Sequence, residues 1–286
     1  MQFRHQLIAL MVTFIWGTNF AFIEIGLREL PPFLFAGLRF TLAALPLVFF
    51  LRKPEASWTQ LASYGFLIGF GQFGLMFWAM QEDITPGLAS LVIQIQVFFT
   101  ILFAAVFFKE SIHRAQWFAL TICAAGLLLI ILYTDGQTTL TGLALILVGA
   151  LSWAGGNLIV KQCGQVNIIA FIAWSALFAI PPLLAMSFMF EGPAIVLSSI
   201  REAGLTSWSV LLWQTIGNTL LGYGLWNMLL NRYSAAVVTP WALLVPVFGM
   251  AASALMLAEP MQWWKFSATL LIISGLAINL WASRQS

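Results

Sequence analysis

Charged residues are scarce in this sequence: Asp, Glu, Lys and Arg make up 8% of the 286 residues, whereas 61% are hydrophobic. A soluble domain carries about 25% charged residues, so this chain lacks the polar surface that a soluble globule of its length needs. Its apolar residues occur in long runs separated by short polar segments. The pattern predicts an all-α polytopic membrane protein with nearly all of its mass in the membrane.

Cysteine and histidine are equally rare. The 2 cysteines, Cys123 and Cys163, are too few for a disulfide framework and are interpreted as unpaired thiols. The 2 histidines, His5 and His113, lie far apart in polar segments, so we expect no metal site and no other cofactor. The net charge of +2 is spread along the chain without a basic tract, which argues against nucleic acid as a partner.

Ten apolar runs have close to the ~20 residues that a helix needs to cross a bilayer. We therefore predict ten transmembrane helices at about 7–27, 33–51, 61–80, 87–108, 115–133, 141–160, 167–189, 208–230, 235–257 and 263–282. The first run resembles a signal peptide, but no small-residue cleavage site follows it. We expect it to be retained as the first span.

The distribution of Lys and Arg predicts the orientation. With the N-terminus inside, eight of the 12 basic residues fall on the inner side: Arg4, Arg52, Lys53, Lys109, Arg114, Lys161, Arg232 and Arg284. The other four fall on the outer side: Arg28, Arg39, Arg201 and Lys265. Because positive residues prefer the cytoplasmic side, this two-to-one bias favours both termini in the cytoplasm.

The second half of the sequence echoes the first. WGTNF near the start is matched by WAGGNL after the midpoint, and Glu110 in AAVFFKES is matched by Glu259 in SALMLAEP. A glycine follows each glutamate by sixteen residues, at Gly126 and Gly275. Short similarities between apolar segments also arise by chance, but the constant offset favours a true repeat.

The repeat predicts the domain organisation. Two units of five helices would occupy residues 1–135 and 136–286. An odd number of spans inverts the second unit relative to the membrane. Inverted repeats enclose a shared site near the midplane that opens to either side in turn. We therefore expect a central cavity between the halves.

Polar side chains recur inside the predicted spans. Trp16 and Asn19 are three residues apart, and Trp153 and Asn157 are four apart, so each pair shares one helical face. Further amides follow at Gln72, Gln94, Gln96, Gln214, Asn218 and Asn227. An amide that faces lipid is costly. Any single amide is compatible with a hydrogen bond between helices, but the set without charged partners favours a wet cavity.

Spacing makes two further predictions. Gln214, Asn218 and Gly222 are four residues apart, which predicts one stripe along the eighth span. Gly65 and Gly69 form a small-xxx-small pair, which permits close contact between helices.

Two opposite charges lie within the first two spans. Glu24 is near the outer end of the first span, and Arg39 is in the outer half of the second. Two arrangements are open: the side chains pair with each other, or both reach the interface. The spans contain no acidic or histidine relay of the kind that marks many proton pumps.

Aromatic residues supply candidate walls for the cavity. Of the 13 tryptophans, those at span ends, such as Trp58, are typical of an interfacial belt. Four aromatic residues within spans are better candidates: Trp78, Tyr223, Trp226 and Trp241. Aromatic walls and neutral amides suit a small polar or zwitterionic solute.

Several segments together resemble the EamA-type drug/metabolite transporters. In the first half these are IWGTNFAFIEIGL, LPPFLFAGLRF, TPGLASLVIQIQVFFTILFA and FFKESIHRAQWFALTICAAGLLLI. In the second half they are SWAGGNLIVKQ, LGYGLWNMLLNRYSAAVVTPWALLVPVFGMAASALMLAEP and ISGLAINL. The resemblance covers nearly the whole chain and is greatest to the bacterial O-acetylserine/cysteine exporters.

The resemblance implies two inverted five-helix EamA-type repeats (1–135 and 136–286) in the bacterial inner membrane, with both termini cytoplasmic. It also implies a central cavity. The residues here that would fall in its wall are Gln72, Trp78, Gln94, Tyr223 and Trp241. One departure concerns the substrate, because family members often carry a lysine where this chain has Glu24.

The function that the resemblance implies is a secondary active or facilitative transporter. It would export small amino acids and related metabolites, such as cysteine or O-acetylserine, by alternating access. The alternative is export of other small polar or aromatic solutes or drugs. A membrane-embedded enzyme is less favoured because no nucleophile, acid/base pair or metal cluster is visible. An assembly subunit is less favoured because it predicts no polar cavity.

The expected partners are membrane lipid and a small polar or zwitterionic metabolite, and the sequence leaves the oligomeric state open. The candidate substrate-binding residues are Trp16, Asn19, Gln72, Trp78, Gln94, Trp153, Asn157, Asn218, Tyr223 and Trp241.

Overall fold

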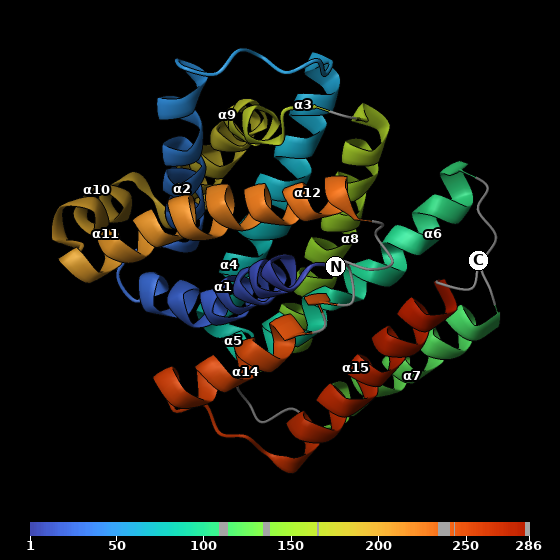
Figure 1. Ribbon diagram of the computed structural model, residues 1–286. Helices are drawn as coiled ribbons and strands as arrows, with labels where there is room; N and C mark the ends of the chain where they lie inside the picture. The colour runs from blue at the N-terminus through green and yellow to red at the C-terminus, as the bar shows by residue number, and fades with distance from the viewer. Residues whose placement is uncertain (109–113, 134–137, 165, 234–240, 243, 284–286) are drawn as a thin grey trace.

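All regular structure in the described part of the chain is helical (Figure 1). The computed structural model describes residues 1–108, 114–133, 138–164, 166–233, 241–242 and 244–283. The sequence prediction of an all-helical protein is therefore confirmed for these residues. Glu110, one of the two glutamates that mark the sequence repeat, lies outside them.

The first half of the chain contains α1 to α7. Their bounds are α1 (Phe3–Leu27), α2 (Pro32–Val48), α3 (Trp58–Gly65), η1 (Phe66–Gly74), α4 (Leu75–Glu82), α5 (Pro86–Val92), η2 (Ile93–Ile95), α6 (Gln96–Phe108) and α7 (Arg114–Leu132). Here η1 is a π-helical segment and η2 a 3₁₀ turn.

The second half contains α8 to α15. Their bounds are α8 (Leu140–Cys163), α9 (Ile168–Met186), η3 (Ser187–Glu191), α10 (Pro193–Glu202), α11 (Leu205–Leu212), η4 (Trp213–Gly222), α12 (Tyr223–Arg232), α14 (Leu244–Leu257) and α15 (Trp263–Ser283). Both η3 and η4 are π-helical.

Helical segments occupy each predicted span within the described residues. Five of them are long and apolar enough to cross a membrane: Phe3–Leu27, Trp58–Glu82, Arg114–Leu132, Leu140–Val160 and Ile168–Glu191. Shorter apolar helices occupy Pro32–Val48, Pro86–Thr100 and Leu244–Leu257. The segment EGPAIVLSSIREAG, between the seventh and eighth predicted spans, contains the short helix α10. Pro193 is its first residue, a position where the missing N–H of proline leaves no hydrogen bond unmade.

Local sequence explains where several helices begin. Ser57 and Gln60 form a capping box at the start of α3, in which each side chain bonds to the other's backbone N–H. The side chains of Thr139 and Asn167 accept hydrogen bonds from the first turns of α8 and α9. Gly192 adopts φ 84°, which lets η3 end and α10 begin in a new direction.

Two long helical segments run from one α-helix through a π-helical stretch into the next α-helix without interruption. The first stretch is η1, between α3 and α4, and the second is η4, between α11 and α12. They fall in the third span of the first predicted unit and the third span of the second. In a π-helix each N–H bonds to the carbonyl five residues earlier, and such turns are frequent at functional sites.

Small residues permit the closest helix contacts, as the sequence predicted for the Gly65/Gly69 pair. A Cβ on Gly65 would lie 2.0 Å from the backbone oxygen of Ser175 in α9, and a Cβ on Gly69 would lie 2.1 Å from the Cβ of Ala179. No side chain fits at either distance, so glycine at both positions sets the spacing between this segment and α9.

Helices α7 and α15 pack side by side at one edge of the molecule (Figure 1). They run antiparallel, because Gln116 near the start of α7 donates a hydrogen bond to Asn279 near the end of α15. Their glycine contacts are reciprocal. A Cβ on Gly126 would lie 2.7 Å from Ile272, and a Cβ on Gly275 would lie 2.5 Å from the sulfur of Cys123.

Carboxylates that follow one helix bind the first turn of another. Glu191, at the end of η3, accepts hydrogen bonds of 2.6 and 3.1 Å from the backbone N–H groups of Phe33 and Leu34 in α2. Glu259, which follows α14, accepts one of 3.1 Å from the N–H of Gly87 in α5. The first N–H groups of a helix lack partners within the helix and favour a negative charge, so these contacts fasten neighbouring spans together.

Glu29, which follows α1, makes a third contact of this kind. Its carboxylate accepts hydrogen bonds from the Ser207 hydroxyl (2.7 Å) and the Gly204 N–H (2.8 Å) at the start of α11. The Ser207 bond, followed by the Gly204 bond, stabilises the charged form and lowers the pKa of Glu29 below its usual value.

This geometry predicts a pH-dependent contribution to stability. A depressed folded-state pKa stabilises the protein above the unfolded-state pKa, and this contribution disappears as the pH falls through the folded-state value. The melting temperature of Glu29→Gln should therefore lie below that of the wild type at pH 7, and the difference should shrink on acidification below about pH 4. Glu55→Gln, which removes an exposed carboxylate, is the control. A difference that stays constant with pH contradicts the assignment.

Candidate functional site

A small cavity of about 40 Å³ lies among helices from both halves of the chain. Its walls come from α1, η1, α4, η2, α8, η4, α12 and α14. The lining residues are Trp16, Asn19, Phe20, Gln72, Phe73, Met76, Ile93, Gln94, Trp153, Asn218, Tyr223 and Val245. No Asp, Glu, Lys or Arg is among them. We call this space the central cavity.

The structure brings most of the predicted site residues to this cavity. Those that line it are Trp16, Asn19, Gln72, Gln94, Trp153, Asn218 and Tyr223. The four amides are almost completely enclosed, with exposed fractions of 2–3%. Their role in binding stays a prediction, but they converge from segments far apart in sequence and place four neutral amides in one pocket.

Trp16 is held against the opposite half of the chain. Its ring lies 5.1 Å from that of Tyr223 and 5.2 Å from that of Trp226, centroid to centroid. A Cβ on Gly222 would lie 2.5 Å from the indole nitrogen, so only glycine at this position lets the indole approach the helix. Gly222, which the spacing of four residues placed on a polar stripe, therefore makes room for the indole ring of Trp16.

Three polar atoms of the cavity wall have no hydrogen-bond partner among the described residues. They are the indole nitrogen of Trp16, Oδ1 of Asn19 and Oε1 of Gln72. Buried polar atoms normally find a partner, and each unpaired one costs free energy. One donor and two acceptors are thus available to water or to a solute in the central cavity.

Three predicted residues lie elsewhere. Asn157 donates hydrogen bonds to Gln96 Oε1 (3.1 Å) and Thr100 Oγ1 (3.4 Å), and so joins α8 to α6. Asn157 and Gln96 therefore have the alternative role that the sequence left open for each amide, a hydrogen bond between helices. Trp153 and Asn157 both lie on α8, yet Trp153 lines the central cavity whereas Asn157 contacts α6.

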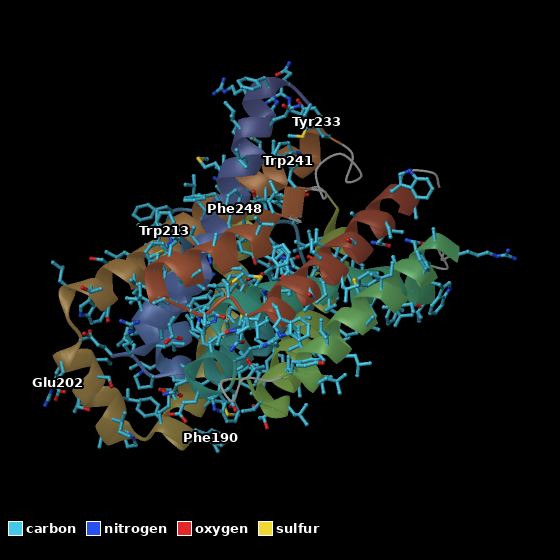
Figure 2. The ribbon with its side chains drawn as sticks, turned by 90° about the horizontal axis from the view of Figure 1, so that it is seen from below. Phe190, Glu202, Trp213, Tyr233, Trp241 and Phe248 are labelled. Carbon is cyan, nitrogen blue, oxygen red and sulfur yellow. The ribbon has the colours of Figure 1, made fainter. Side chains whose placement is uncertain are left out.

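Trp78 and Trp241 lie toward opposite ends of the molecule. Trp78 packs against Phe33 (5.4 Å) and Phe190 (5.8 Å) and is 38% exposed. Trp241 packs with a small cluster around α1 and α12, and it lies near Tyr233 at the end remote from Phe190 (Figure 2). Both tryptophans are therefore outside the central cavity.

The predicted stripe of Gln214, Asn218 and Gly222 is also split. Asn218 lines the cavity, whereas Gln214 accepts a hydrogen bond of 3.0 Å from Nη1 of Arg39. Thr219, five residues after Gln214, accepts one of 3.0 Å from Nε of the same arginine. The reason is the π-helical register of η4, in which residues five apart, rather than four, lie together.

Arg39 itself does not reach the interface and does not pair with Glu24, the two arrangements that the sequence left open. Its side chain is 0% exposed, and Cζ lies 3.8 Å from the centroid of the Phe73 ring. The fully buried Lys265 is different, because it forms an ion pair of 3.1 Å with Glu259. The complete burial of Arg39 was not predicted from the sequence, in which the available signal was a positive charge within a span.

The apolar cavity walls were also missed. Phe20, Phe73, Met76, Ile93 and Val245 line the cavity, yet such residues occur throughout every span. In a chain that is 61% hydrophobic, an apolar wall residue carries no signal of its own. Only the amides and indoles stand out against that background.

Comparisons with known proteins agree with this architecture. The model of the EamA-like transporter family matches residues 4–132 and 140–281. A protein of Salmonella typhimurium named "Probable amino-acid metabolite efflux pump" is 39% identical over 283 residues, covering 97% of this chain and 95% of its own. A protein of Escherichia coli with the same name is 37% identical over 287 residues, covering 98% and 96%. A solved crystal structure of another protein shares the fold, with a TM-score of 0.68 and 18% identity over 99% of this chain and 98% of that one.

Proposed function

Because the chain belongs to the EamA-like transporter family, whose members are membrane transporters and not enzymes, we propose that it exports small amino acids and related metabolites by alternating access. The substrates proposed are of the cysteine and O-acetylserine kind. The names of its relatives, amino-acid metabolite efflux pumps, support this class. Secondary active and facilitative transport are both included.

The central cavity is the observation that carries the proposal. Eight of its lining residues come from the first half of the chain, and the other four come from the second half. Neutral amides and aromatic rings supply donors, acceptors and contact area without a net charge. Such a lining suits a zwitterion, whose two opposite charges sum to zero.

We further propose that residues 1–135 and 136–286 are inverted five-helix repeats. The reciprocal contacts of Gly126 and Gly275 support this, because a two-fold axis between α7 and α15 exchanges them. The π-helical stretches η1 and η4, each in the third span of its unit, support it as well. We also propose that both termini lie in the cytoplasm, which the bias of Lys and Arg supports.

Transport requires the cavity to widen. A cavity needs roughly 10–15 Å³ to hold one water molecule, so a volume of about 40 Å³ holds a few waters and no amino acid. The form described here is therefore interpreted as closed. Glu29, Glu191 and Glu259 follow spans that end on the predicted outer side. Opening toward that side would separate their contacts with neighbouring helices, and opening toward the cytoplasm would leave these contacts intact.

Aromatic walls favour a second candidate, export of other small aromatic solutes or drugs. Trp16, Phe73, Trp153 and Tyr223 surround the cavity and present ring surface to it. Competition experiments separate the two candidates. An amino-acid exporter should be inhibited by unlabelled cysteine or O-acetylserine, whereas a drug exporter should be inhibited by planar aromatic compounds.

Efflux from liposomes tests the proposal. The purified full-length chain is reconstituted, the vesicles are loaded with labelled L-cysteine under reducing conditions or with labelled O-acetyl-L-serine, and release is followed. We expect release well above that of protein-free vesicles, and at least tenfold slower release for Trp16→Ala and for Trp153→Ala. Trp58→Ala, which removes an exposed indole at a span end, is the control. Release no faster than from protein-free vesicles overturns the proposal.

A further inference from the structure

Arg39 is a buried cation that no carboxylate contacts among the described residues. Its hydrogen bonds go to the neutral groups of Thr219 and Gln214, and its Nη2 has no hydrogen-bond partner there. Burying an unpaired charge is costly, and the aromatic faces of Phe73, Phe40 and Phe77 offset only part of the cost. The arginine thus retains one donor that an anion would satisfy.

This cation lies directly behind a wall of the central cavity. Its Cζ is 3.8 Å from the centroid of Phe73, and Phe73 lines the central cavity. Thr219, which accepts the hydrogen bond from Nε, lines a second cavity of about 10 Å³. Phe73 and Tyr223 are walls of both cavities. The Phe73 ring therefore lies between the guanidinium of Arg39 and the central cavity.

The unpaired atoms around the central cavity are complementary to Arg39. Oδ1 of Asn19 and Oε1 of Gln72 are acceptors without donors, which is what an ammonium group requires. Nη2 of Arg39 is a donor without an acceptor, which is what a carboxylate requires. An α-amino acid carries both groups on one carbon atom.

We propose that Arg39 binds the carboxylate of the transported amino acid, while Asn19 and Gln72 bind its ammonium group. Phe73 covers the guanidinium in the closed form and moves aside when the substrate enters. The inference rests on the proposed function. It adds the orientation of the bound amino acid and names Arg39 as the residue that selects solutes with a carboxylate. Charge-assisted hydrogen bonds from arginine to a carboxylate are stronger than its contact with an aromatic face, so the exchange is favourable.

A purely structural role makes a different prediction. Arg39 also joins α2 to the π-helical segment η4 through Gln214 and Thr219. If joining these helices were its only role, its loss would weaken the binding of every solute in the same proportion. The discriminating quantity is therefore the ratio of affinities for an acid and for its uncharged ester, which helix packing alone does not change.

Binding to the full-length chain in nanodiscs measures this ratio with two probes, L-cysteine and L-cysteine methyl ester. The ester keeps the ammonium and the thiol but lacks the carboxylate. We expect Arg39→Met to weaken L-cysteine binding roughly tenfold to a hundredfold, the range for hydrogen bonds to a charged group, and to change ester binding less than about threefold. Arg39→Lys should keep part of the preference for the acid. Arg28→Gln, outside the cavity, should leave the ratio unchanged.

A second variant tests the inference with the arginine in place and covers the case in which Arg39→Met does not fold. Phe73→Ala uncovers the guanidinium, so it should raise the acid-to-ester affinity ratio several-fold. An unchanged ratio in Phe73→Ala, or an equal loss for both probes in a folded Arg39→Met, overturns the assignment of Arg39. If the liposomes still show amino-acid efflux, the proposed function survives that result. If the wild-type chain binds neither probe and the liposomes show no efflux, both fall together.

Discussion

Replacing Asn218 by leucine is expected to lower efflux at least tenfold while the protein still folds and inserts. Asn218 is 3% exposed and lines the central cavity from η4, and it makes no side-chain hydrogen bond to another described residue. Its amide is therefore available to the substrate. Leucine is similar in size but offers neither donor nor acceptor, and one lost hydrogen bond to a charged group costs about 1.5–3 kcal/mol, enough for a tenfold effect.

The measurement is the initial rate of efflux from proteoliposomes, normalised to the amount of folded protein incorporated. Asn157→Leu is the matched comparison, because it removes the same amide from a residue that bonds to Gln96 and Thr100. That variant should lower the melting temperature and keep most of its flux per folded molecule. Normal flux in Asn218→Leu, or equal loss of flux in both variants, contradicts the distinction between the two amides.

The second large effect concerns folding. Gly65→Leu is expected to prevent stable packing of the third span, because a Cβ at this position would lie 2.0 Å from the backbone oxygen of Ser175. Backbone atoms of α9 cannot yield without moving the helix. Overpacking in a close-packed interior costs typically 1–3 kcal/mol, and a contact with the backbone belongs above that range. Total stabilities are about 5–15 kcal/mol, so we expect loss of the folded population.

Size-exclusion chromatography of a fluorescent fusion in mild detergent reports this loss as an aggregated or absent peak. Gly69→Leu should behave in the same way because of Ala179 in α9. Gly224→Ala is the control, since the nearest atoms to a Cβ there belong to Ile169 at 4.0 Å, an ordinary contact. A monodisperse peak for Gly65→Leu at the wild-type position would show that α9 tolerates the side chain.

Some residues of the site were predictable from sequence. An amide or an indole inside an apolar run must meet protein or water, since lipid offers it no hydrogen bond. Trp16 and Asn19, and the amides Gln72, Gln94 and Asn218, were identified in this way and all line the central cavity. The prediction worked because the penalty acts on each residue separately, whichever helix lies next to it.

Other residues were not predictable, because their environment depends on which helices meet. Asn157 has the same composition signal as Asn218, yet it faces α6 and finds partners there. Arg39 has the signal of an interfacial charge, yet it is enclosed by η4 and by Phe73. Periodicity of 3.6 residues per turn also failed in η4, where the π-helical register brings Gln214 and Thr219 together.

The sequence by itself determined that the protein is helical, where its helices lie, and that neutral polar groups sit within them. It could do so because the length of an apolar run and the cost of a polar group in lipid are properties of one segment at a time. The tertiary structure decided which amides face a cavity and which join helices, and it placed a buried arginine behind the cavity wall. These outcomes depend on contacts between segments far apart in sequence, whose pairing no single segment encodes.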